Sequence, residues 1–378
     1  MSAAAAVAGN TSISTAPNHT RRQNPSFRRL STILRLSQTS NTLTSAAAAD
    51  PSPVFRSVES FAPATVANLG PGFDFLGCAV DGLGDVVTVS VDPSIPPGTL
   101  SISSITGDHH SAVSKLSRNP SYNCAGIAAI AAMRMLGVRS VGLSLRLYKG
   151  LPLGSGLGSS AASAAAAAVS VNALFGGLLS PTELVLAGLE SEAKVSGHHA
   201  DNIAPSLMGG FVLIRSYEPL DLIRLAFPLE RKLFFVLVSP EFEAPTKKMR
   251  AALPELVKRE DHVANSSQAA ALVAAILQGN VRVLGSALSS DAIVEPKRAP
   301  LIPGMLAVKK AAVEAGAFGC TISGSGPTVV AVVEDEEKGR EVGRRMVEAF
   351  LIGGGLKAAA VVARLDRVGA RVINTTAD

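Results

Sequence analysis

The sequence predicts an α+β protein built from two domains. Stretches with the alternation or β-branched residues of strands are mixed with longer stretches typical of helices, and the two kinds do not alternate strictly as they do around a parallel sheet. The chain has 378 residues, and the part after residue 50 exceeds the roughly 250 to 300 residues at which one core usually stops growing. We place the boundary between residues 206 and 220 and assign the domains to 51–215 and 216–378.

The N-terminal domain opens with short apolar runs at 61–80, which prolines and glycines interrupt. Residues 84–91 carry four valines and are predicted to form a strand. A helix is predicted at 123–137, and a half-buried strand at 141–150, where apolar and polar residues alternate. A glycine-serine loop then leads into an alanine-rich helix, and a further helix is predicted at 183–194.

Around the domain boundary, strands at 211–216 and 232–240 flank a turn at Pro219. Helices are predicted at 263–279 and 305–316, because each apolar pattern ends at a glycine. Residues 321–335 form two apolar runs around a glycine turn, and 339–351 have the pattern of an amphipathic helix.

The loop LPLGSGLGSSAA at 151–162 is typical of a site that holds an anion. Gly154, Gly156 and Gly158 have no Cβ, so their N–H groups can turn toward phosphate oxygens at a helix N-terminus. The hydroxyls of Ser159 and Ser160 follow directly. The spacing is neither that of a Walker loop nor that of a dinucleotide-binding fingerprint, so the loop alone is equally compatible with a plain turn before a buried helix.

No charged residue lies between Lys149 and Glu183, a stretch long enough to cross a bilayer. It is rich in Ala, Gly and Ser and contains Pro152 and Asn172, so a buried helix is favoured over a membrane span.

The first 49 residues contain five arginines, no lysine and no acidic residue, and they are rich in Ser, Thr and Ala. This composition is typical of an organelle transit peptide, and we predict disorder at 1–50 and delivery to the chloroplast stroma. A mitochondrial address and an untargeted tail remain alternatives. The five arginines account for the whole net charge of +5, so the neutral remainder gives no reason to expect nucleic acid or an anionic membrane as a partner.

The three cysteines, Cys78, Cys124 and Cys320, are far apart and form no CxxC pair. They indicate reduced thiols rather than disulfides or a zinc site. The absence of Trp and the presence of only three Tyr also weigh against a base-stacking surface.

Three separated glycine segments, at 64–77, 151–162 and 321–328, together resemble the three motifs of the GHMP kinase superfamily. The resemblance implies a ribosomal protein S5 domain 2-like N-terminal domain and a ferredoxin-like α/β sandwich at the C-terminus, with ATP and Mg²⁺ as cofactors. It assigns ATP binding to Asn123, Pro152, Leu153, Gly154, Ser155, Gly156, Leu157, Gly158, Ser159, Ser160, Gly324 and Gly326.

Within that superfamily, the segments at 67–74, 196–205, 295–304 and 363–372 are similar to those of homoserine kinases. This implies ATP-dependent phosphorylation of the L-homoserine hydroxyl to O-phospho-L-homoserine, for threonine synthesis, by a homodimer. The resemblance nominates Ser160 and Glu192 for Mg²⁺, whereas Glu190 falls on another face of its helix.

Homoserine carries an ammonium, a carboxylate and a hydroxyl. By resemblance, Asn68 and Asp74 bind the amino end and Arg250 and Arg298 the carboxylate, a task suited to the bidentate guanidinium. Thr246 is expected near the transferred phosphoryl group.

Asp201 and Asn202 are expected to orient the attacking hydroxyl, because a loose transition state does not require early proton removal. A general-base role for Asp201 stays open. No role is carried over to His198 or His199, since the spacing from Glu192 to Asp201 departs from the family pattern.

Two other functions remain as alternatives. A mevalonate or sugar kinase of the same superfamily acts on a substrate without an ammonium group, which Asp74 and the paired arginines disfavour. A non-catalytic ATP-binding sensor is disfavoured because Glu192, Ser159 and Ser160 are all present.

Overall fold

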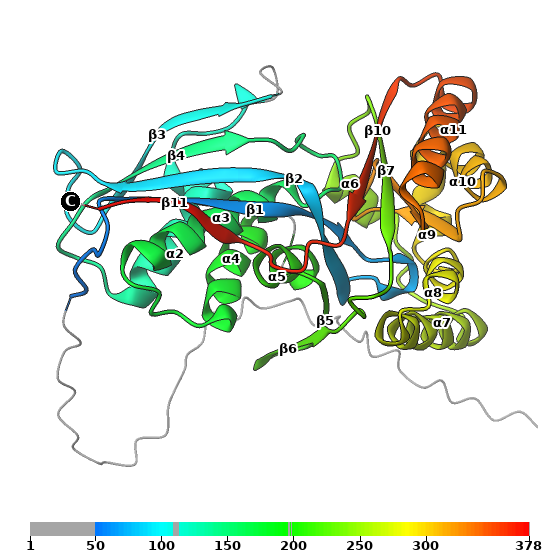
Figure 1. The fold of residues 1–378 in the computed structure, drawn as a ribbon, viewed down its shortest axis with the longest axis horizontal. Helices are drawn as coiled ribbons and strands as arrows, with labels where there is room; N and C mark the ends of the chain where they lie inside the picture. Colours follow the sequence, from blue (N-terminus) through cyan, green and yellow to red (C-terminus); the bar gives the residue numbers. More distant parts are fainter. Residues whose placement is uncertain (1–49, 109–112, 196, 198, 378) are drawn as a thin grey trace, which may run out of the picture. The chain divides into compact units, whose positions relative to one another are not determined.

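The computed structural model describes residues 50–108, 113–195, 197 and 199–377. The predicted transit peptide, except for Asp50, and His198 lie outside these residues. The described chain forms two β-sheets with helices packed against them (Figure 1).

The first sheet has seven strands, which come from both the N-terminal and the C-terminal parts of the described chain. Its strands are β1 (Ser57–Ala67), β2 (Leu76–Val91), β3 (Leu100–Gly107), β4 (Leu143–Lys149), β5 (Phe211–Tyr217), β6 (Leu220–Leu225) and β11 (Arg371–Thr376). The order is β11-β1-β2-β4-β3, while β5 pairs with β2 and β6 with β5. Among the described strands of this sheet, only β3 and β4 pair in parallel, and the other neighbours are antiparallel. The sheet is therefore mixed rather than built from βαβ units.

The helices on one face of this sheet are α2 (Cys124–Leu136), α3 (Ser159–Leu174), α4 (Pro181–Val195) and α5 (Ala200–Met208) (Figure 1). Helix α3 is alanine-rich and buried on nearly all sides, because it packs against α2, α4, α5 and the sheet. Small side chains permit this close approach. The long uncharged stretch is therefore accounted for by a buried helix. Among the described helices, none combines the length and apolarity needed to cross a bilayer.

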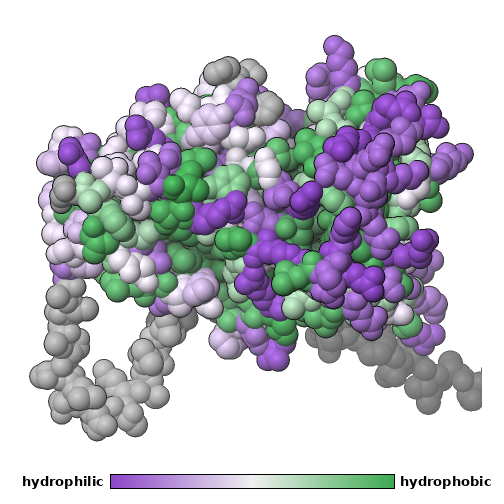
Figure 2. All heavy atoms as spheres, in the orientation of Figure 1, coloured by the Kyte–Doolittle hydropathy of each residue, from purple (hydrophilic) through white to green (hydrophobic). Residues whose placement is uncertain are grey.

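The second sheet has the order β10-β7-β9-β8, with β7 (Phe234–Pro240), β8 (Gly319–Ile322), β9 (Val329–Val333) and β10 (Ala358–Arg364). Side chains alternate along β7: Phe235 and Leu237 enter the core shared with the first sheet, whereas Val236 and Val238 enter a second core. Helices α7 (Arg259–Gln278) and α8 (Val281–Leu288) contribute to the shared core, and α10 (Met305–Glu314) and α11 (Glu336–Gly354) to the second. Hydrophilic side chains cover much of the α11 side (Figure 2).

Five short helical segments are also found in the described chain: η1 (Gly70–Gly72), η2 (Pro120–Tyr122), α6 (Thr246–Ala251), α9 (Glu295–Arg298) and η3 (Ala299–Leu301), which directly continues α9. Helices α6 and α9 carry three of the predicted site residues.

The α+β class is confirmed. The predicted boundary at 215/216, however, falls inside β5. Strands β6 and β11, both assigned to the C-terminal domain, pair within the first sheet because β6 forms a hairpin with β5 and β11 adds to the edge of β1. The limits of the domains stay a prediction, but sheet membership does not follow chain order.

Candidate active site

One cavity of about 370 Å³ brings most of the predicted site residues together. The predicted residues among those that line it are Asn68, Asp74, Asn123, Leu153, Gly154, Ser155, Gly156, Gly158, Ser159, Ser160, Glu192, Asp201, Asn202, Thr246, Arg250, Arg298 and Gly324. Pro152, Leu157 and Gly326 do not line it. Leu157 is buried in the core beneath the loop, and the Pro152 carbonyl accepts a hydrogen bond from Ser155 Oγ (3.0 Å) that closes the turn.

The loop at 151–158 has the backbone of an anion cradle. Gly154, Gly156 and Gly158 adopt left-handed φ values of 62°, 82° and 67°, and Gly158 caps α3 without a side-chain hydrogen bond. Within the described chain, the backbone N–H groups from Gly154 to Ser160 donate no hydrogen bond. These donors and the N-terminal end of the α3 dipole border the cavity and fit the phosphates of ATP.

Two neighbours hold this loop in place and exclude side chains from it. Ser323 Oγ donates to the Gly156 carbonyl (2.7 Å), and the Thr328 N–H donates to the Ser155 carbonyl (3.1 Å). A Cβ on Gly156 would lie 2.4 Å from the Ser323 carbonyl oxygen. The glycine loop at 323–328 therefore packs directly against the phosphate loop.

The two residues nominated for Mg²⁺ meet across α3 and α4. Ser160 Oγ donates to Glu192 Oε1 (2.9 Å), and Glu192 is buried at the cavity. Glu190 instead pairs with Arg134 near the surface, as its place on another helix face predicts. No cluster of three or more His, Cys, Asp or Glu suited to a metal occurs among the described residues. A hydroxyl and one carboxylate fit Mg²⁺, which keeps several water ligands.

The predicted homoserine-binding charges are already paired with one another. Arg250 Nη1 and Nη2 donate to the two carboxylate oxygens of Asp74, both at 2.9 Å. Asn68 Oδ1 accepts the Asp74 N–H (3.0 Å), so both residues stand at the same end of the cavity. Asp74 and Arg250 thus form one bidentate pair, and the assignment of the amino end to Asp74 and of the carboxylate to Arg250 stays a prediction.

The Arg298 side chain is buried rather than exposed at the surface. It is 2% exposed, and its guanidinium donates to the backbone carbonyls of Gly324 (3.0 Å) and Met249 (3.3 Å). Burial, reinforced by the nearby charge of Arg250, lowers its pKa to about 10. The guanidinium thus connects α9, α6 and the 323–328 loop at the edge of the cavity.

Asp201 lies at the start of α5 and is 3% exposed. Burial raises its pKa to about 7, with smaller contributions from the negative charges of Asp74 and Glu192 and an opposing one from Arg250. A carboxyl that titrates near neutrality has the property required of a general base. The alternative left open by the sequence analysis therefore gains a physical basis beside substrate orientation.

Three other predicted positions have defined partners. Thr246 Oγ1 lies 3.2 Å from Ser325 Oγ. Asn123 Oδ1 caps α2 by accepting the Ala125 N–H (3.0 Å), and the assignment of Asn123 to ATP binding stays a prediction. His199 lines the cavity, with Nδ1 3.6 Å from Asp74 Oδ2.

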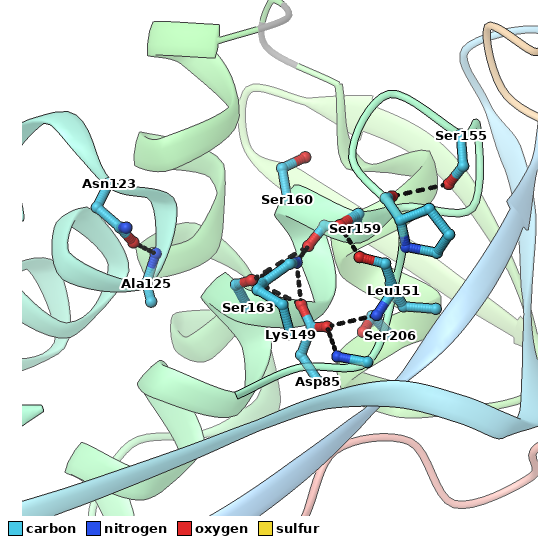
Figure 3. Close-up of polar contacts among 12 residues, drawn as sticks. Asp85, Asn123, Ala125, Lys149, Leu151, Ser155, Ser159, Ser160, Ser163 and Ser206 are labelled. Atoms are coloured by element: carbon cyan, nitrogen blue, oxygen red, sulfur yellow. Dashed lines mark hydrogen bonds and ion pairs between the residues drawn. The ribbon is translucent and has the colours of Figure 1, made fainter. Parts of the chain in front are cut away.

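A buried ion pair that was not predicted from the sequence lies beneath the phosphate loop (Figure 3). Lys149 Nζ pairs with Asp85 and donates to Ser159 O (2.8 Å) and Ser163 Oγ (2.9 Å). Asp85 Oδ1 accepts the N–H of Leu151 (3.2 Å), while Ser160 points away from this cluster (Figure 3). Because three acceptors occupy the three protons of the ammonium, this lysine holds the loop rather than a phosphate. Its one sequence signal is a cation placed immediately before the loop.

The chain matches the family model of the GHMP kinases N terminal domain at residues 123–210 and that of the GHMP kinases C terminal at 272–352. It is 71% identical over 328 residues to the homoserine kinase of Arabidopsis thaliana, covering 87% of this chain and 88% of that one. It is 40% identical over 325 residues to the homoserine kinase of Chloroherpeton thalassium, covering 84% and 100%.

Solved structures agree with these matches. The crystal structure of homoserine kinase from Cytophaga hutchinsonii superposes with a TM-score of 0.78 at 39% identity, covering 84% of this chain and 98% of that one. A mevalonate kinase from L. major, 15% identical with a TM-score of 0.63 over 83% and 99% of the two chains, shares the fold. The two-domain GHMP kinase fold expected from the resemblance is confirmed. The chain belongs to the homoserine kinases of the GHMP kinase superfamily.

Proposed function

We propose that the chain transfers the γ-phosphoryl group of ATP to the side-chain hydroxyl of L-homoserine, giving ADP and O-phospho-L-homoserine. One observation carries the proposal. A single cavity holds both a row of unpaired backbone N–H donors at 154–160 and the opposite charges of Asp74 and Arg250. The first fits a polyphosphate and the second a zwitterion.

In this proposal, the loop amides bind the nucleotide phosphates and stabilise negative charge that develops during transfer. Ser160 and Glu192 would hold Mg²⁺, and the bound ion would supply positive charge beside the phosphate oxygens. The preformed loop requires little rearrangement, because Lys149 and Ser323 already fix it from two sides.

Homoserine enters by exchanging partners with an existing ion pair. Its ammonium takes the Asp74 carboxylate and its carboxylate takes the Arg250 guanidinium, so no charge is left unpaired in the cavity. Asp201 and Asn202 then orient the hydroxyl toward the phosphoryl group, and Asp201 accepts the proton when it leaves.

A coupled assay of ADP release by the full chain tests this activity. With ATP and Mg²⁺, the chain should turn over L-homoserine with a higher kcat/KM than mevalonate or galactose, because those substrates offer no ammonium to Asp74. Preference for either of them would assign the chain to another substrate class. Nucleotide binding without turnover of any hydroxyl substrate would support the sensor alternative.

The proposal extends to location and assembly. The acid-free, arginine-bearing segment at 1–49 supports delivery to the chloroplast stroma, where the product would serve threonine synthesis. The family resemblance supports a homodimer. A fluorescent protein fused to residues 1–55 should accumulate in chloroplasts, and light scattering of the purified chain should give twice the monomer mass. A diffuse cytosolic signal would contradict the location, and a monomer mass would contradict the dimer.

A further inference from the structure

Thr65 connects the phosphate loop to the residues that orient the substrate hydroxyl. It lies on β1 and is completely buried. Its N–H donates to the Leu157 carbonyl of the phosphate loop (3.1 Å), and its Oγ1 donates to Oδ1 of Asn202 on α5 (2.7 Å).

The same contact explains why Gly158 has no side chain. A Cβ at Gly158 would lie 2.0 Å from Thr65 Oγ1 and 3.0 Å from Asn202 Oδ1. The last glycine of the phosphate loop thus gives the Thr65 hydroxyl access to Asn202. The contact depends on the Thr65 hydroxyl and on the space that Gly158 leaves for it. Both residues therefore help to fix the position of the Asn202 amide.

In the structure, the Thr65 hydroxyl holds that amide with Oδ1 turned toward Thr65. An Asn side chain has one oxygen that accepts and one nitrogen that donates. Because the Thr65 hydroxyl occupies Oδ1, the donors on Nδ2 remain. They make no hydrogen bond to any described residue, and Asn202 lines the cavity. The reversed amide would present its oxygen, and hence a repulsive partial charge, to a phosphoryl group.

We propose that Thr65 is a positioning residue for phosphoryl transfer: its hydroxyl fixes the amide of Asn202 so that Nδ2 donates to the reacting oxygens. This inference rests on the proposed kinase activity. The contribution of Thr65 acts through Asn202, whereas nucleotide binding depends on the loop amides and on the backbone bond from Thr65 to Leu157, which a side-chain substitution leaves intact.

Steady-state kinetics of the full chain with the Thr65→Val variant tests the inference, because valine keeps the shape of threonine and removes only the hydroxyl. We expect kcat to fall about 10-fold to 100-fold, with the KM values for ATP and L-homoserine changed by less than about two-fold. Thr65→Ser should recover most of the lost kcat. Thr88→Val, which removes a hydroxyl from β2 away from the cavity, is the matched control and should leave kcat unchanged.

A double-mutant cycle separates positioning from general damage. In the Asn202→Ala background, Thr65→Val should cause no further loss of kcat, because the group that it positions is gone. A kcat of Thr65→Val within about two-fold of wild type, a full additional loss in the Asn202→Ala background, or failure of Thr65→Ser to recover activity would each overturn the inference. If the wild-type chain does not phosphorylate homoserine, the proposed function fails instead, and that result is seen before any variant is compared.

Discussion

Removal of the Lys149 ammonium is expected to destabilise the chain strongly. Lys149→Met keeps the apolar length of the side chain but leaves the Asp85 carboxylate, which is completely buried, without its counter-charge. The carbonyl of Ser159, the first residue of α3, loses one of its donors at the same time and keeps the Ser163 hydroxyl.

The structure sets the size of the effect. Removing one partner of a buried ion pair typically costs about 3 to 5 kcal/mol. The full range applies here because the side chains of Lys149 and Asp85 are only 3% and 0% exposed. The double variant Asp85→Asn/Lys149→Met leaves no charge at this pair, and the Asn oxygen can still accept the N–H of Leu151. It should therefore lose less stability than Lys149→Met alone.

Urea unfolding followed by circular dichroism measures these free energies. Lys310→Met is the matched control: it removes an exposed lysine that lies 3.7 Å from Glu314, and it should cost less than about 1 kcal/mol. The reasoning would be refuted if Lys149→Met were destabilised no more than Lys310→Met, or if the double variant were less stable than Lys149→Met.

Three further predictions concern the cavity. Because burial raises the pKa of Asp201 to about 7, the folded chain keeps a proton that the unfolded chain releases above about pH 4. The free energy of unfolding of the ligand-free chain should therefore fall between about pH 4 and pH 7, by up to about 1.4 kcal/mol per pH unit from this group, and Asp201→Asn should remove that contribution in urea titrations at successive pH values. Gly158→Ala should lower kcat/KM for ATP by more than about 10-fold, since its Cβ would meet Thr65 Oγ1 at 2.0 Å and its φ is +67°; kinetics near the wild-type values would contradict that packing. Glu192→Gln should raise the Mg²⁺ concentration for half-maximal activity by about 10-fold or more, because one ligand charge next to Ser160 is lost, and an unchanged Mg²⁺ titration would place the metal elsewhere.

The sequence predicted those parts of the site whose requirements are local. The phosphate loop needs positive φ values, free amides and hydroxyls within a dozen consecutive residues, and glycines and serines at 151–162 specify all three. The family resemblance nominated Ser160 and Glu192 for one metal site, and the structure brings their side chains within hydrogen-bonding distance. The helix period placed Glu190 on another face, where it pairs with Arg134.

The missed residues carry no local signal beyond the position of Lys149 just before the phosphate loop. Asp85 and Lys149 are separated by 64 positions and look like ordinary surface charges until the fold buries them together. Thr65 is one of many threonines in strands, and its role depends on a contact with Asn202, 137 positions away. Long-range contacts of this kind depend on tertiary packing, and local patterns in a single sequence do not predict them.

The membership of β6 and β11 in the first sheet could not be predicted for a similar reason. Strand β11 is exposed along nearly its whole length, so it lacks the alternation from which strands are predicted. It is held by backbone pairing to β1 rather than by a buried face. Strand β6 forms a hairpin with β5 across the predicted domain boundary, because the turn at Pro219 joins them directly.

The most direct test of the central claim is a crystal structure of the full chain with a non-hydrolysable ATP analogue, Mg²⁺ and L-homoserine. The β- and γ-phosphates should lie within hydrogen-bonding distance of the N–H groups of 154–160, and the homoserine ammonium should lie against Asp74 with its hydroxyl directed at the γ-phosphate. A nucleotide bound elsewhere, with this loop free of phosphate, would contradict the account.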